Sequence, residues 1–151
     1  ATAAGCQLIS SCDLAYSSSR AKYATPGVNI GLFCSTPMVP LSRTVGKKQA
    51  MEMLLTGDLI DANKALRIGL INDVFEEDSL KENVFQIAKK ISSKSSNTIK
   101  IGKEAFYKQK DMNLEDAYTF TSNVMTENML HDDSKEGIDA FLEKREPNWK
   151  E

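Results

Sequence analysis

The feature that most limits the fold is a scarcity of strand-forming segments beside a long helical stretch. Short strands are predicted at 12–16 (CDLAY), 21–25 (AKYAT) and 70–75 (LINDVF). From Pro37 onward, apolar residues recur mainly at helical spacing. Because a few isolated strands do not make a stable sheet, we expect the first third of the chain to pair with strands that this chain does not contain.

The helical part is divided by cap and stop residues. Gly46 and Gly57 predict the break and the end of two helices within 37–57, and Asp61 and Gly69 predict the caps of a short one. Further helices are predicted over 77–95 with a cap at Asp78 or Ser79, over 97–109, over 113–130 with a cap at Asn113, and from 132 to before Pro147, whereas 25–36 (TPGVNIGLFCST) reads as a loop.

Composition and charge exclude several classes of function. With 151 residues, 41% of them hydrophobic and 26% charged, the chain has the make-up of one globular domain or a large part of one. A net charge of -2 supplies no basic field for nucleic acid or a membrane surface. We expect no membrane span, because no apolar run approaches about 20 residues. The first residues hold no targeting peptide, so any such segment is expected upstream.

Cysteine and histidine do not suggest a metal or redox site. Cys6, Cys12 and Cys34 match no zinc or disulfide spacing, so three reduced thiols in a reducing compartment and no bound metal are expected. His131 stands at a polar helix boundary beside two aspartates, which favours a surface position over a catalytic one.

The first residues, ATAAGCQL, predict a turn of small residues that leads into a helix. The first N–H groups of a helix lack partners within the helix, and small side chains let a ligand approach them. Such a turn suits a phosphate or the oxyanion of a polarised thioester. Close packing of the helix against a neighbour also favours Ala and Gly, and this stretch alone leaves both readings open.

Four segments in one order carry a family resemblance: AAGCQLISSCDLAYSS, AKYATPGVNIGL, RTVGKKQAMEMLLTGDLIDANKALRIGLINDVF and EGIDAFLEKREPNW. The chain resembles the C-terminal half of the crotonase family, which is the enoyl-CoA hydratase and isomerase group. The resemblance implies an α/β fold, a spiral of ββα units truncated here to residues 1–76, followed by a helical trimerisation and lid region at 77–151. A chain of this kind is mostly α.

The resemblance also implies a function and a location. Crotonases bind acyl-CoA thioesters, whose coenzyme A is part of the substrate, so no separate cofactor is expected. Two backbone N–H groups hold the thioester oxygen. Ala4 matches one of them, and the other belongs to a loop upstream of this chain. The expected whole protein is a mitochondrial homotrimer or hexamer of fatty-acid metabolism.

The chain departs from the family at its acid and base positions. Hydratases use two glutamates because an acid and a base must act on the same water and substrate carbon. The matching positions are Gln7 and Gly27, and an isomerase aspartate position is Asn29. An amide is no general base at neutral pH and glycine has no side chain. Gln7 and Asn29 are expected either to contact a ligand through hydrogen bonds or to fill an inherited pocket.

The C-terminal helix carries the predicted coenzyme A contacts. Lys144 is the best match to a family lysine that meets the phosphates, and Phe141 would pack near the adenine or the acyl chain; Arg145 and Trp149 lie close by. Solvent-exposed or core roles for these residues stay open. The favoured hypothesis is therefore an acyl-CoA-binding protein with weak or altered catalysis. The alternatives are a non-catalytic structural partner and an inactive fragment.

Overall fold

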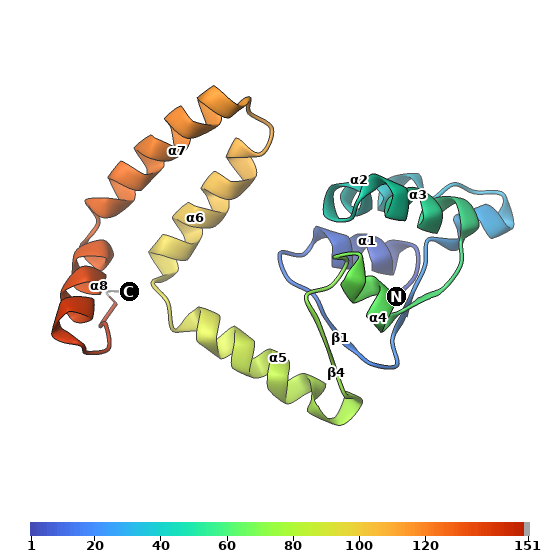
Figure 1. Ribbon diagram of the computed structural model, residues 1–151, viewed down its shortest axis with the longest axis horizontal. Helices are drawn as coiled ribbons and strands as arrows, with labels where there is room; N and C mark the ends of the chain where they lie inside the picture. The colour runs from blue at the N-terminus through green and yellow to red at the C-terminus, as the bar shows by residue number, and fades with distance from the viewer. Residues whose placement is uncertain (150–151) are drawn as a thin grey trace. The chain divides into compact units, whose positions relative to one another are not determined.

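The computed structural model describes residues 1–149 and divides into two compact units, the first spanning Ala1–Gln86 and the second beginning at Ile87. The boundary between Gln86 and Ile87 falls inside the helix α5 (Glu77–Ser92), which Figure 1 labels. The division predicted from the sequence, into residues 1–76 and 77–151, separates the ββα core of the family from its helical trimerisation and lid region. It is a division of another kind and stays a prediction. Each unit is described by itself.

The first unit packs short helices around short strand pairs. Its elements before α5 are α1 (Ala4–Ser11), β1 (Tyr16–Ser18), β2 (Lys22–Tyr23), the 3₁₀ helix η1 (Pro26–Ile30), α2 (Ser35–Thr44), α3 (Lys47–Thr56), β3 (Ile60–Asp61), α4 (Ala62–Arg67) and β4 (Asp73–Phe75).

The strands of this unit form two pairs. β1 pairs with β4 in parallel, with Tyr16 opposite Asp73, and β2 pairs with β3 antiparallel, with Tyr23 opposite Ile60. The strand predicted at 12–16 is wrong in its bounds: the Cys12 N–H still bonds to α1, and pairing begins only at Tyr16. β3 was not predicted, since two residues carry no alternation. The predicted loop at 25–36 contains η1, which Pro26 starts.

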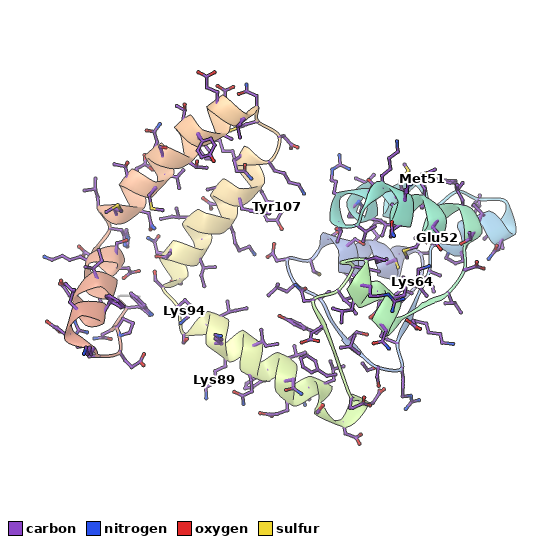
Figure 2. All side chains as sticks on the ribbon, in the orientation of Figure 1. Met51, Glu52, Lys64, Lys89, Lys94 and Tyr107 are labelled. Atoms are coloured by element: carbon purple, nitrogen blue, oxygen red, sulfur yellow. The ribbon has the colours of Figure 1, made fainter. Side chains whose placement is uncertain are left out.

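The predicted caps in this unit are largely confirmed. α2 ends at Thr44 and α3 begins at Lys47, on either side of the break at Gly46, and Gly57 follows α3 with a left-handed φ of 67°. The Asp61 carboxylate accepts the Lys64 N–H at 2.7 Å and so caps α4. The Lys64 ammonium on α4 in turn forms an ion pair with the Glu52 carboxylate on α3 at 2.8 Å. Figure 2 labels both residues.

The core of the first unit lies between α1, α2 and α3, which lie together in Figure 1, and it includes Tyr23 of β2 and Ile60 of β3. The Thr44 hydroxyl donates to Ser10 O at 3.0 Å and ties the end of α2 to α1. The fully buried larger side chains are Leu41, Met53, Leu54, Thr25 and Cys6. Cys6 and Cys34 are buried free thiols, and Cys12 is an exposed one.

The second unit is helical. It contains α6 (Ser96–Gln109), α7 (Leu114–Met129) and α8 (Asp132–Glu143), and Figure 1 shows α6 and α7 as an antiparallel hairpin. Asn113 caps α7 as predicted, accepting the Asp116 N–H at 3.0 Å. The half-exposed His131 is the N-cap of α8.

One predicted helix cap and one predicted helix start need correction. α5 begins at Glu77, where the helix was predicted to begin, but Asp78 and Ser79 lie inside its first turn, so neither is the cap. α6 begins one residue before the predicted Asn97, because the Ser95 hydroxyl accepts the Thr98 N–H at 3.0 Å and caps the helix there.

The segment after α8 folds back onto that helix. Arg145 forms two bonds to the Glu136 carboxylate, at 2.6 and 3.1 Å, and a third to Glu143 at 2.5 Å. The Trp149 indole donates to Ser93 O at 2.9 Å, and its ring lies where a side chain at Gly137 would project. We call these residues, 136, 137, 145 and 149, the C-terminal clasp. Among residues 1–149, no helix is both long and apolar enough to cross a bilayer.

Candidate active site

The turn before α1 has a strained backbone. Ala3 has φ 46° and ψ -112°, a region that residues with a side chain rarely occupy. The Gly5 N–H closes the turn onto Thr2 O at 2.8 Å, and the Ala3 N–H bonds to Ala24 O at 3.0 Å. A turn with positive φ at its second residue normally has glycine there. The alanine is held by the bond to Ala24 and by the parallel bridge between Thr2 and Ala24.

The Ala4 N–H has no acceptor among the described residues. Ala4 is the first residue of α1 and is exposed, so this N–H lies at the positive end of the helix dipole. Gly5 removes a side chain from the next position, where an added Cβ would lie 3.2 Å from Ala1. The arrangement therefore presents one accessible backbone donor suited to a carbonyl oxygen or an anion.

Gln7 follows one turn later on the same helix. Its N–H bonds to Ala3 O at 3.0 Å, and its side chain is half-buried. Within residues 1–149 the side-chain amide forms no hydrogen bond, so it can contact a ligand. Cys6 beside it is buried, and that burial raises the pKa of the thiol above its ordinary value. Gln7 therefore offers an amide, and Cys6 a neutral thiol.

Gly27 and Asn29 lie in η1, shortly after the segment that bonds to the Ala3 turn. Asn29 is an exposed residue whose amide lies over Gly57, about 3.1 Å from where a Cβ on that glycine would be. Its amide is thus packed against the end of α3. The hydrogen bond from Ala3 to Ala24 brings the turn of Ala4 and Gln7 close to the start of η1.

The two predicted coenzyme A contacts lie in the second unit. Phe141 is 81% exposed and lines an open pocket of about 670 Å³ between α6, α7 and α8, together with Ile99, Met125, Met129, Ile138 and Leu142. Lys144 ends α8 in a left-handed conformation, with φ 55°. Arg145 and Trp149 are already engaged in the C-terminal clasp, so neither offers an unbonded polar group.

A polar group at the edge of this pocket was not predicted from the sequence. The Ser95 hydroxyl donates to the buried Asp133 carboxylate at 2.5 Å, linking the start of α6 to α8. Asn128 Oδ1 is buried nearby without a hydrogen-bond partner. Only the Ser-x-x-Thr spacing of the α6 cap could have drawn attention to Ser95, and nothing local indicates that Asp133 is buried. No group of three potential metal ligands gathers within the part of the chain that the structure describes.

Comparison with known proteins decides the family. The family model for enoyl-CoA hydratase/isomerase matches residues 1–151. The chain belongs to the enoyl-CoA hydratase/isomerase family. The mouse (Mus musculus) mitochondrial enoyl-CoA hydratase domain-containing protein 3 is 52% identical over 149 residues, which cover 99% of this chain and 50% of that protein.

Solved structures of this family confirm the predicted fold class. The human enoyl-coenzyme A hydratase domain-containing protein 3 superposes with a TM-score of 0.96 at 52% identity, covering 99% of this chain and 59% of that one. An enoyl-CoA hydratase of Mycobacterium smegmatis superposes with a TM-score of 0.96 at 45% identity, and the match covers 99% of this chain and 58% of that one. The chain thus spans about half the length of the relatives it matches, and the truncated crotonase fold predicted from the sequence is confirmed.

The finer resemblance is also confirmed. The segment ATPGVNIGLFCSTP, at 24–37, predicts likeness to mitochondrial enoyl-CoA hydratase domain-containing protein 3. The mouse and human members of that group are 52% and 51% identical to this chain over 149 residues. The predicted mitochondrial location is the one that the names of these family members give.

Proposed function

We propose that this chain supplies part of an acyl-CoA thioester site in a mitochondrial protein of fatty-acid metabolism. The observation that supports it is the strained Thr2–Gly5 turn with its unbonded Ala4 N–H. A thioester oxygen bound there gains negative charge as an enolate forms, and a donor that is fixed beforehand stabilises that charge without reorganising. By the family resemblance, the second donor comes from a segment outside this chain.

The proposed chemistry lacks the proton transfers of hydration. Gln7 and Gly27 stand at the two glutamate positions and Asn29 at the aspartate position, so no carboxylate is available at any of the three. Gln7 would orient the thioester or a water by hydrogen bonding. Phe141 and Lys144 would contact the adenine or acyl chain and the phosphates of coenzyme A. We propose weak catalysis, or isomerisation or thioester hydrolysis driven mainly by polarisation of the carbonyl.

Replacing Ala4 with proline tests the proposal. Proline removes this N–H and is well tolerated at the first position of a helix. Leu114→Pro is the matched control, because Leu114 is the exposed first residue of α7 and lies far along the chain from the turn. Calorimetric titration with an acyl-CoA should show binding by the unchanged protein and by the control, and at least about tenfold weaker binding by Ala4→Pro. Equal binding by all three would reject the role of Ala4, and full hydratase turnover by the unchanged protein would reject the reading of Gln7 and Gly27.

A structural role is the second candidate. The second unit exposes large apolar side chains on all of its helices, and Leu130, which directly follows α7, is 83% exposed. This exposure favours burial against further copies, as in the homotrimer or hexamer expected from the resemblance. A protein that assembles but shows no heat of acyl-CoA binding would support the structural role over the enzymatic one.

A further inference from the structure

The backbone of Gly27 is bonded at both ends to residues that follow it. Its N–H donates to the Cys34 thiol at 3.4 Å, and its carbonyl accepts the Leu32 N–H at 2.9 Å. Gly31, with a left-handed φ of 76°, ends η1 and allows the chain to turn back between these two bonds. Residues 27–34 thus form a loop that closes on its own first residue.

This closed loop leaves no space for a side chain at position 27. A Cβ there would lie 2.6 Å from Leu32 O and 2.9 Å from Cys34 Sγ, both shorter than real Cβ contacts. The Leu32 oxygen belongs to the backbone and is held by the loop, so it cannot swing aside as the end of a flexible side chain could. Position 27 also lacks the positive φ of Gly31, Gly57 and Gly69. Glycine is therefore required at 27 by space and not by backbone angle.

We infer that Cys34 Sγ and Leu32 O fill the space that a side chain at the family's second acid/base position would need. No single substitution at residue 27 can therefore place a carboxylate there. The inference rests on the family correspondence used in the proposed function. Its consequence is a restriction on the reaction: residue 7 is the one side chain at the two glutamate positions that can face a substrate. Chemistry that pairs an acid and a base at these two positions is excluded, whereas polarisation of a thioester carbonyl is not.

Hydrogen exchange at the Leu32 amide tests the closure. Gly27→Ala adds only the Cβ, and Gly102→Ala is the control, since a Cβ at Gly102 meets nothing within 4 Å. We expect exchange at Leu32 to accelerate by about tenfold or more in Gly27→Ala as its bond to residue 27 opens, and to stay unchanged in Gly102→Ala. An unchanged Leu32 rate in a folded Gly27→Ala protein would overturn the inference.

A second variant keeps the test valid if Gly27→Ala does not fold. Cys34→Ala removes the acceptor of the Gly27 N–H and adds no atoms. Exchange at the Gly27 amide should then rise severalfold, and an unchanged rate would show that the thiol does not hold the loop.

Enoyl-CoA hydration provides the chemical readout. The double variant Gln7→Glu/Gly27→Glu should hydrate enoyl-CoA no faster than the single variant Gln7→Glu. A faster double variant in which the Leu32 amide stays protected from exchange would overturn the inference. Failure of the unchanged protein to bind acyl-CoA would reject the proposed function, while the exchange results at Leu32 and Gly27 would still decide the closure.

Discussion

Ala3 and Lys144 hold backbone angles that usually belong to glycine. Ala3 has φ 46° in the turn before α1, and Lys144 has φ 55° where α8 ends. A side chain in the left-handed region costs about 1–2 kcal/mol. At Lys144 the conformation lets the Arg145 N–H reach Ala140 O at 3.0 Å, a common way to end a helix. At Ala3 it ends no helix and instead orients the Ala4 N–H.

Relief of the strain at Ala3 is measurable. Ala3→Gly should raise the free energy of unfolding, or leave it unchanged, because the lost strain of about 1 kcal/mol offsets the added freedom of the unfolded chain. Ala88→Gly, at an exposed position inside α5, should lower it by about 1 kcal/mol. Urea unfolding gives both values. A clear loss of stability in Ala3→Gly would contradict the strained turn.

The buried thiol of Cys6 predicts a pH dependence. Burial, and to a lesser degree the nearby Cys34, raise the pKa of Cys6 in the folded protein, although a backbone bond to Ala24 opposes this. A raised folded pKa gives stability that is fully present below the unfolded thiol pKa, about 8.5, and is lost as pH rises above it. Cys6→Ala should therefore flatten the decline of unfolding free energy above that pH. Cys12→Ala, at an exposed thiol, should leave the decline unchanged.

At the scale of elements, the C-terminal motif EGIDAFLEKREPNW holds the segment after α8 against that helix. Glu136 and Arg145 hold the segment against α8, Gly137 leaves room for the Trp149 ring, and the indole reaches Ser93. The resemblance placed ligand contacts in this motif at Phe141 and Lys144, which the clasp leaves exposed.

Loss of the clasp should be visible in fluorescence, because Trp149 is the one tryptophan of the sequence. Arg145→Met should shift its emission to longer wavelength as the indole leaves Ser93, while Lys110→Met, at an exposed lysine, should not. Bonds to Glu136 and then Glu143 raise the pKa of Arg145 above its already high value, so the clasp should persist up to about pH 10. Emission of Arg145→Met equal to that of the unchanged protein would show that Arg145 does not hold the segment.

At the scale of the whole molecule, assembly is the expected consequence of the second unit's exposed apolar side chains. Sedimentation of the unchanged protein should give a species heavier than a monomer, and Leu130→Lys should shift it to lighter species by placing a charge on that surface. Leu55→Lys, at an exposed leucine of the first unit, should leave the assembly unchanged. A monomeric unchanged protein would contradict the proposed homotrimer or hexamer.

The sequence by itself determined most helices, three of their caps and the family. Helical spacing, Gly57, Asp61 and Asn113 act over three or four residues. The long ordered motif at 43–75 carries the resemblance to the family that the family model confirms. Only the tertiary structure decided that the Ala3 backbone is strained, that Gly27 has no room for a side chain and that Arg145 is bonded to Glu136. Those properties depend on atoms brought together by packing: Ala24 against the first turn, Cys34 against Gly27, and Glu136 against Arg145. Local spacing does not encode such contacts.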